Sequence, residues 1–456
     1  MGPKAVYPGT GKLFVSPLRE LINLKHPLVK LADTIDWDRI HKVCGELFAS
    51  GRGRPAVSPR LISGLLYLQY AFGLSDEDVV FGWVENPYWQ VFTGEEYLQI
   101  EPPIDPSSLT RWRKRLGEAG VEELLSVTLD TAVKSGHLKE KSFETVIVDT
   151  TVMEKNVAYP TDSNLLERSR KHLVKAASEN GIILRQNYNR EAPSLVRQIG
   201  RYAHARQFRR MHKCLRTLKS RVGRVWRDVE RQLDKVSCEA RIVLEELLRR
   251  TRRVLDQKPG DKGKLYALHA PEVECISKGK SRTPYEFGVK VSVTSTLKAG
   301  FVMGCRSMPG NPYDGHTLHE ALEQASILSD KAIKTAVVDK GFRGVEIDGV
   351  RILRSGQKKG VTRTIKKMIK RRSAIEATIS HMKIDGKLGR NWLKGADGDA
   401  IHAVLCAAGY NLRLLIRKLR LFYAWILDLW LETIHADSSG NKMFSADFYK
   451  NAAAIS

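Results

Sequence analysis

The sequence predicts an α/β protein with a helical N-terminal domain. Five short segments between residues 145 and 353 have the apolar, β-branched or alternating pattern of strands, and helical patterns precede, interrupt and follow them. The 456 residues, 42% of them apolar, suffice for two or three domains with a sizeable core. We expect helices over residues 1–138, the α/β domain over 139–432 and a C-terminal tail over 433–456.

Three helices are expected in the N-terminal domain. The first begins at Pro59 and ends near Gly73, and Ser75 caps the second. The third, capped by Ser107 or Ser108, carries basic residues that we predict to contact DNA: Arg111, Arg113 and Arg115. This arrangement fits a helix-turn-helix-like DNA-binding module, although an ordinary helical bundle with a solvated basic face would give the same pattern.

The expected strands span residues 145–148, 287–294, 301–308, 332–338 and 350–353. The second and third form a hairpin around Lys298–Gly300. The first and fourth each end in an acid, Asp149 and Asp339. Ligands and catalytic groups gather at the carboxyl ends of strands in α/β sheets, but an aspartate after a strand is also a common turn former.

The net charge of +24 favours a polyanionic partner, because each Lys or Arg placed on a phosphate releases condensed counterions. The excess is concentrated between the first and second strands, where residues 165–258 hold 25 Lys/Arg and 10 Asp/Glu. Apolar residues at helical spacing predict a helical insertion over 165–262, such as an antiparallel hairpin. We expect it to contact the DNA backbone, and a solvated arm without a partner is the alternative. The basic residues proposed for this contact are Arg206, Arg209 and Arg210.

Other features of the sequence narrow the class of protein. The six cysteines include no CxxC pair, which argues against a zinc site and a disulfide framework and predicts reduced thiols. The most apolar stretch, residues 421–431, contains Asp428 and is shorter than the roughly 20 residues needed to cross a bilayer. The first twelve residues lack the apolar core of a signal peptide. We therefore expect a cytoplasmic protein with no membrane partner.

A third acid lies in a different context. Residues 361–384 contain no Gly or Pro, so we predict one helix. Within it, Arg372, Glu376 and Lys383 fall within roughly 40° of one face. A carboxylate flanked by two cations suits a site for metal and phosphate, whereas a surface salt-bridge ladder is the alternative.

The order of the three acids indicates a nuclease. Two aspartates after strands and a glutamate on a following helix are the arrangement that an RNase H-like nuclease needs. Mg²⁺ prefers oxygen ligands and keeps several waters, so a few carboxylates and a substrate phosphate suffice to hold it. Two ions roughly 4 Å apart can activate the attacking oxygen and stabilise the leaving one. We expect Asp149, Asp339 and Glu376 to meet in one site.

At these residues the sequence resembles the DDE transposases of bacterial insertion sequences, in particular the IS-five group, over most of the chain. The matching segments are Val148-Asp149-Thr150-Thr151, Asp339-Lys340-Gly341-Phe342-Arg343-Gly344, the helix Arg372-Ser373-Ala374-Ile375-Glu376 with Lys383, Leu388-Gly389-Arg390-Asn391, Gly409-Tyr410-Asn411-Leu412 and, more loosely, Gly51-Arg52-Gly53-Arg54-Pro55. One departure is Ile369, where the related motif often has a Tyr three residues before the Arg.

The resemblance implies an RNase H-like catalytic domain that cleaves DNA at transposon ends and joins it to target DNA. Asp149, Asp339 and Glu376 would hold two Mg²⁺ or Mn²⁺ ions, and Arg372 and Lys383 would contact DNA. The expected partner is double-stranded DNA, comprising the terminal inverted repeats and the target, bound by a homodimer.

Two alternatives to the catalytic function remain open. One is a non-catalytic DNA-binding protein derived from a transposase. The other is a basic helical scaffold that binds RNA or membrane. A further acid, Asp314 in Gly310-Asn311-Pro312-Tyr313-Asp314-Gly315-His316, belongs either to a turn or to the surroundings of the metal site.

Overall fold

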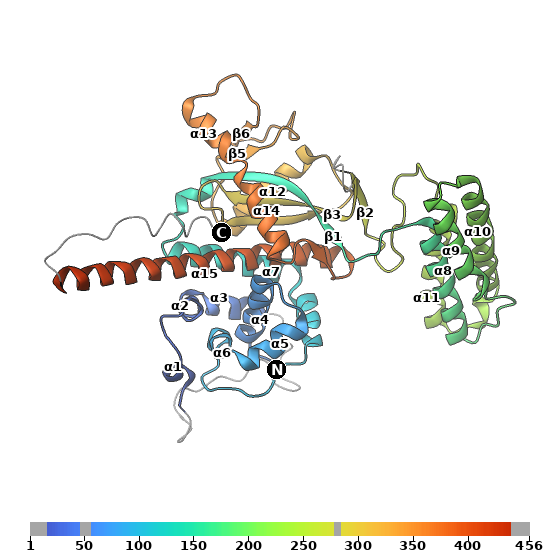
Figure 1. The fold of residues 1–456 in the computed structure, drawn as a ribbon, viewed down its shortest axis with the longest axis horizontal. Helices are drawn as coiled ribbons and strands as arrows, with labels where there is room; N and C mark the ends of the chain where they lie inside the picture. Colours follow the sequence, from blue (N-terminus) through green and yellow to red (C-terminus); the bar gives the residue numbers. More distant parts are fainter. Residues whose placement is uncertain (1–15, 46–55, 278–283, 439–456) are drawn as a thin grey trace.

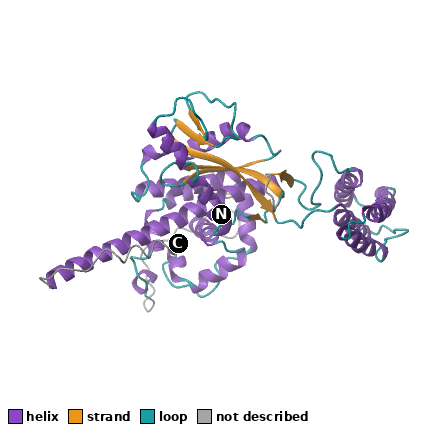
Figure 2. Cartoon of the chain, turned by 45° about the horizontal axis from the view of Figure 1, so that its top comes forward, coloured by secondary structure: helices purple, strands orange, loops and turns teal. Residues whose placement is uncertain are grey.

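The computed structural model describes residues 16–45, 56–277 and 284–438, with side chains described up to Arg420. The predictions for the first twelve residues, for Gly51–Pro55 and for residues 439–456 lie outside the described residues, as do the side chains of the apolar stretch 421–431. The fold is mixed α/β: a curled mixed sheet, helices packed against it and below it, and a helical insertion to one side (Figures 1 and 2).

The sheet has seven strands, and β1 lies at its centre. The strand order is β2 (Glu274–Ser277), β3 (Tyr285–Thr296), β1 (Thr145–Lys155), β5 (Thr335–Val338) and β6 (Arg351–Arg354). In addition, β4 (Val302–Met308) pairs with β3 and β7 (Arg390–Asn391) pairs with β1. β1 runs antiparallel to β3 and parallel to β5.

The five predicted strands are all present, and the predicted hairpin is the antiparallel pair β3–β4. The prediction that the first strand ends at Asp149 is wrong, because β1 continues to Lys155. Pairing with β3 extends from Val146 to Glu154. This pairing continues the strand through Asp149 and Glu154, although acidic residues are uncommon in strands.

Three long helices pack on the sheet, and two of them connect it to the N-terminal helices. α7 (Ser107–Lys134), α12 (Asp314–Ser329) and α15 (Gly395–Ser438) contact β4, and α15 also packs along α7 and α4 (Figure 1). The segment Gly395–Arg420 is long and apolar enough to cross a membrane, but 89% of its most apolar 18-residue window is buried inside the structure. Such burial is typical of the core helix of a globular domain.

The N-terminal helices are α1 (Leu18–Leu21), α2 (Pro27–Thr34), α3 (Trp37–Gly45), α4 (Pro59–Phe72), α5 (Asp76–Glu85) and α6 (Pro87–Thr93). The predicted start of α4 at Pro59 and its end at Gly73 are confirmed, with Gly73 in the left-handed conformation. Ser75 and Asp78 form the capping box that begins α5. The third predicted helix, α7, is present, but the prediction that Ser107 or Ser108 caps it is wrong. Ser107 is its first residue, Pro106 is the N-cap, and Asp105 accepts a hydrogen bond from the Ser107 N–H.

The N-terminal helices share one hydrophobic core with the sheet. α4 is buried over most of its length, and the same cluster of buried residues continues across position 138 to β1, β3 and α15. Glycine allows α15 to approach closely, since a side chain on Gly409 would overlap the backbone of Tyr70. The predicted boundary at residue 138 therefore crosses a continuous core.

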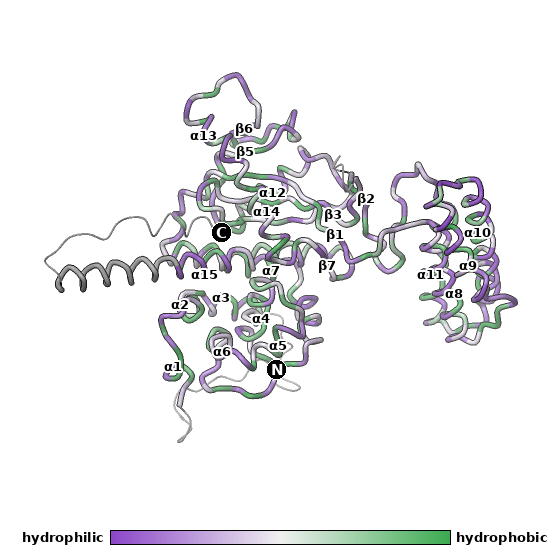
Figure 3. The backbone as a smooth tube through the Cα atoms, viewed as in Figure 1, coloured by the Kyte–Doolittle hydropathy of each residue, from purple (hydrophilic) through white to green (hydrophobic). Residues whose placement is uncertain are grey.

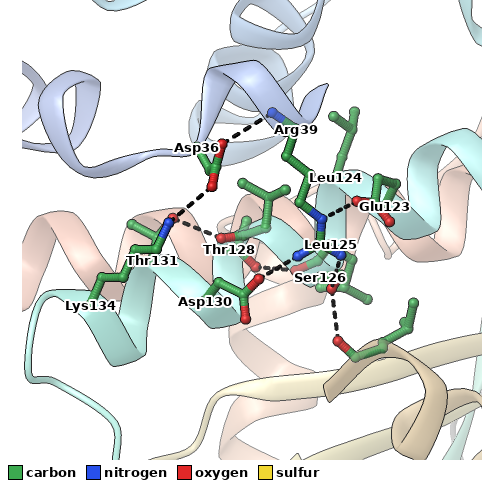
Figure 4. A network of polar contacts seen from close by, with 12 residues as sticks. Asp36, Arg39, Glu123, Leu124, Leu125, Ser126, Thr128, Asp130, Thr131 and Lys134 are labelled. Carbon is green, nitrogen blue, oxygen red and sulfur yellow. Dashed lines mark hydrogen bonds and ion pairs between the residues drawn. The ribbon is translucent and has the colours of Figure 1, made fainter. Parts of the chain in front are cut away.

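A polar network on α7 fixes α3 to the rest of the structure (Figure 4). Arg39 of α3 donates to Glu123 and Asp130, and its remaining Nη atom donates to the Ser126 hydroxyl at 3.0 Å. Ser126 in turn donates to the Leu328 carbonyl of α12 at 2.8 Å. α7 is thus held on one side by the Arg39 side chain and on the other by a backbone carbonyl of α12.

The insertion between β1 and β2 is helical, as predicted, but it contains four helices instead of a single hairpin. These are α8 (Asp162–Glu179), α9 (Glu191–His204), α10 (Phe208–Glu230) and α11 (Cys238–Asp256). A short 3-10 helix, Leu233–Lys235, lies between α10 and α11, and another, Glu140–Glu144, precedes β1. Two apolar clusters form the insertion's own core, and it stands apart from the sheet on two connecting segments (Figures 1 and 3).

The single helix predicted over residues 361–384 is broken into α13 (Arg363–Arg371) and α14 (Ala374–Ile384). At the break, the N–H groups of Arg372, Ile375 and Glu376 each bond to the carbonyl three residues earlier. The Ser373 hydroxyl also donates to the Lys370 carbonyl at 3.2 Å. A serine that competes for backbone carbonyls disfavours a regular α-helix, which explains a break without Gly or Pro.

A buried histidine joins α15 to α4. Nε2 of His402 donates to the Lys387 carbonyl at 2.9 Å, so Nδ1 is left to accept from the Tyr70 hydroxyl at 3.1 Å. Burial, aided by the nearby cations Lys387, Arg113 and Lys155, lowers the pKa of His402 to about 3. The ring is therefore neutral in the folded chain at any pH above that value.

This histidine predicts a loss of stability in acid. An unfolded histidine takes up a proton below its ordinary pKa of about 6.5, while folded His402 does not until about pH 3. The unfolded state binds more protons over this range, so the free energy of unfolding should fall as the pH drops, by up to about 1.4 kcal/mol per pH unit from this residue. Denaturant unfolding of the wild type and His402→Gln between pH 7.5 and 4.5 checks this. Parallel pH profiles for the two proteins would contradict it.

Candidate active site

The register of β1 against β5 places Asp149 beside Asp339. Thr145, Val146 and Ile147 pair with residues 335, 336 and 337, a constant offset of 190. Asp149 and Asp339 have the same offset and lie two positions beyond the last pair. Side chains at matching positions of neighbouring strands point to the same face, so both carboxylates leave the sheet together.

The break between α13 and α14 brings the third acid to the same place. Arg372 lies at the break and Glu376 in the first turn of α14. α14 packs against β1 and buries Ile375 and Met382 in the main core. These apolar contacts fix the helix so that Arg372 and Glu376 face the two aspartates.

One guanidinium connects the three acids. Arg372 contacts Glu376 through Nη2 at 2.6 Å, Asp149 through Nη1 at 3.3 Å and Asp339 through Nε at 3.8 Å. Its side chain is 16% exposed, against 21% for Asp149, 46% for Asp339 and 60% for Glu376. The site is therefore closed around Arg372 and open to solvent on the side of Glu376.

Asp314, left undecided by sequence reasoning, lies beside this cluster. It is the first residue of α12, and its Oδ1 accepts from the Thr150 hydroxyl and from the Lys290 ammonium, both at 3.0 Å. Thr150 follows Asp149, and the Asp314 carboxylate also packs against Gly341, two residues after Asp339. Asp314 thus contacts the neighbours of both aspartates.

Two further side chains hold the backbone around Asp314, and the sequence alone did not identify them as part of the site. Lys290 on β3 is 7% exposed, and it donates to the Pro312 carbonyl at 2.6 Å as well as to Asp314. The Tyr313 hydroxyl accepts from the Arg343 N–H at 3.1 Å and so ties the loop after Asp339 to α12. A lysine within an alternating strand gave no local signal, because its partner lies 24 residues away.

The other predicted DNA contacts fall in different surroundings. Lys383 lies half-buried, about two turns beyond Glu376 on α14. Arg111 and Arg115 are exposed on α7, and Arg115 stacks over the Trp112 ring. The prediction for Arg113 needs correction: its side chain is 5% exposed and is paired with Asp76 and Gln69, so it stabilises the domain and cannot reach DNA.

The basic residues predicted in the insertion lie together at one end of it. Arg206, Arg209 and Arg210 are exposed at the turn between α9 and α10, where Arg206 has a left-handed backbone with φ of 54°. Phe208, at the start of α10, is 54% exposed. Lys213, Arg216 and Arg221 line a shallow hollow of about 530 Å³ farther along α10. All of these side chains are at least partly exposed to solvent.

The donor set of the acid cluster fits a hard divalent cation. All three side chains are carboxylates, which suit Mg²⁺ or Mn²⁺ better than softer metals. As they stand, no group of three His, Cys, Asp or Glu side chains in the described part of the chain is close enough to hold a metal ion. Arg372 accounts for this spacing, because its guanidinium lies between the carboxylates.

Comparison with known proteins identifies relatives of this chain. Residues 16–115 match a family model described as a transposase domain (DUF772). Over 208 residues the chain is 46% identical to "Uncharacterized protein ORF8 in nfe locus" of Rhizobium meliloti, a match that covers 46% of this chain and 100% of that protein. No solved structure matches. The chain therefore belongs to the same family as the rhizobial ORF8 protein, and its residues 16–115 carry a transposase domain.

Proposed function

We propose that the chain is a DDE transposase, which cleaves DNA at transposon ends and transfers the freed strand into target DNA. Asp149, Asp339 and Glu376 would hold two Mg²⁺ or Mn²⁺ ions. The observation that carries the proposal is the convergence of these acids, from two strands and a helix, on Arg372. The transposase domain at residues 16–115 independently supports the same class of protein.

The chain's own residues would position the DNA and balance charge. The three acids and Arg372 together carry a formal charge of −2, which attracts cations to the cluster. When bound, the two ions would activate the attacking oxygen and stabilise the leaving one. Arg372 would then turn from the carboxylates to the scissile phosphate, for which its planar fork of donors is suited. Lys383 would add a second cation on the same helix.

No covalent bond between enzyme and DNA is expected. In cleavage, water would attack the phosphorus and the 3′-oxygen of the broken strand would leave. In strand transfer, that 3′-hydroxyl would attack a target phosphodiester in the same site. The protein's contribution to both steps would be alignment and a preorganised field.

The same proposal includes the finer features expected from the sequence. They are an RNase H-like arrangement of the sheet, a cytoplasmic location, duplex DNA as the partner and a homodimer on that DNA. The alternative function is a non-catalytic DNA-binding protein derived from a transposase. The accessible cluster of three carboxylates favours catalysis, because a protein that only binds phosphate gains nothing from acids near the DNA.

The first prediction from this proposal concerns the acids themselves. Asp149→Asn, Asp339→Asn and Glu376→Gln should each reduce Mg²⁺-dependent cleavage of end-containing DNA below about 1% of wild type, since an amide is a poor replacement for a ligating carboxylate. DNA binding should persist, because it rests on many basic side chains. Glu346→Gln, an exposed glutamate in the loop beyond Asp339, is the matched control and should cleave normally. Full cleavage by Glu376→Gln would remove that helix from the site.

A second prediction concerns Asp314 as a positioning residue. Asp314→Asn keeps an oxygen for Thr150 and Lys290 but loses the charge, so cleavage should fall about 10- to 100-fold and need more Mg²⁺ for its half-maximal rate. Asp330→Asn, at the other end of α12, should leave both quantities unchanged. An Asp314→Asn protein with a reduced rate but an unaltered Mg²⁺ requirement would show that Asp314 serves folding only.

A further inference from the structure

The segment that leads into Arg372 has an unusual charge. Residues 351–371 contain nine Lys or Arg and no Asp or Glu, and they form β6, the loop 355–362 and α13. We call this segment the basic lobe. It lies at the edge of the sheet beside β5 (top of Figure 1), and sequence reasoning did not single it out.

The helix of the basic lobe separates its charges from its apolar side chains. Ile365 is buried, and Met368 and Ile369 pack half-buried against the main core. The opposite face presents four exposed basic residues at the spacing of one helical stripe: Arg363, Lys366, Lys367 and Lys370. The apolar face fixes α13 to β5 and β6, so the stripe is held rigidly outward.

Carboxylates of the described residues do not neutralise the charges of the lobe. None of the nine basic side chains forms an ion pair with a carboxylate in the part of the chain that the structure describes. Arg371 instead donates to the carbonyls of Leu297 and Lys298, at 3.2 and 2.9 Å. The insertion differs, since several of its basic residues pair with acids of the same unit, among them Arg170, Arg221, Arg241, Arg249, Arg250 and Arg252.

The lobe also borders the acid cluster. α13 ends at Arg371, and the next residue is Arg372, whose guanidinium contacts all three acids. On the other side, Lys340 follows Asp339 and packs against Gly356 in the loop of the lobe. A phosphate backbone lying on the stripe would therefore continue directly to Arg372.

We propose that the basic lobe is the surface on which duplex DNA binds next to the acid cluster, with Arg363, Lys366, Lys367 and Lys370 on consecutive phosphates. The inference rests on the proposed function, for it names where that reaction's DNA lies. The stripe is roughly 10 Å long, at 1.5 Å per helical residue, and a DNA strand advances about 3.4 Å per phosphate along its axis. The stripe thus spans about three phosphate-to-phosphate steps of one strand, which join four phosphates.

The test compares double variants that each remove two positive charges. Lys366→Gln with Lys370→Gln changes the lobe, Arg209→Gln with Lys213→Gln changes the insertion, and Lys139→Gln with Lys141→Gln, exposed residues before β1, is the control. Binding of the full-length proteins to a fluorescent duplex is measured by anisotropy without divalent ions, across a range of NaCl concentrations. Thermal melting checks that every variant is folded.

The lobe variant should bind about tenfold more weakly and lower the slope of log affinity against log salt by about 1.8, that is 0.9 for each lost phosphate contact. Its cleavage rate at saturating DNA should also fall, because the strand is no longer aligned with the acids. The control should match the wild type in all three measurements.

Two outcomes would overturn the proposal. A lobe variant with wild-type affinity and salt slope would exclude the lobe as a binding surface, whether or not the insertion variant binds weakly. Weakened binding with an unchanged cleavage rate at saturation would place the DNA on the lobe away from the acids. Failure of the proposed function is separate, since cleavage by Glu376→Gln would remove the catalytic assignment without altering these salt slopes.

Discussion

The parallel pairing of β1 with β5 is the constraint on which the rest of the site depends. A slip of one residue would turn Asp149 to the opposite face of the sheet, away from Asp339. The register is protected by the buried apolar residues before each aspartate and by the long antiparallel pairing of β1 with β3. The far end of β1 is fixed as well, because buried Lys155 lies 2.8 Å from both Glu272 and Asp399. The insertion departs just after this anchor, which separates it from the acids.

Once the strands have placed the acids, their mutual repulsion has to be offset. Arg372 supplies the offset from within the chain, and three contacts to one guanidinium are possible because that group is planar and offers five donors. A lysine at this position would be a single point charge on a flexible stem. The break before α14 matters here, because it places Arg372 between two helices instead of within one continuous helix. Arg372 therefore holds the three carboxylates around one point, and in the proposed function it would exchange them for phosphate.

Local patterns in the sequence predicted most helices and strands. Features that depend on contacts between distant residues could not be predicted in this way. Pro59, Gly73 and the Ser75 cap act within a few residues, as do the apolar runs before Asp149 and Asp339, so they were visible in the sequence. The extension of β1 to Lys155 and the burial of Arg113 depend on partners far along the chain. The position of Asp314 also requires the fold, because its contacts join α12 to β1 and β3. Charge patterning indicated a basic protein but not which basic side chains pair internally.

Whether a basic side chain is paired within the chain changes what the net charge of +24 implies about function. Charge that is paired within a unit stabilises the unit and contributes little to the field felt by an approaching polyanion, whereas unpaired charge on a rigid face contributes fully. The insertion contains both kinds, and its ion pairs tie helices or neighbouring turns together. Among the described residues, the basic lobe contains only the second kind, and it adjoins a cluster whose own charge is negative. In the proposed function, a DNA strand drawn to the lobe would be repelled by the acids until cations neutralise them. Binding of DNA and binding of metal should therefore reinforce each other, with Arg372 exchanging partners between the two.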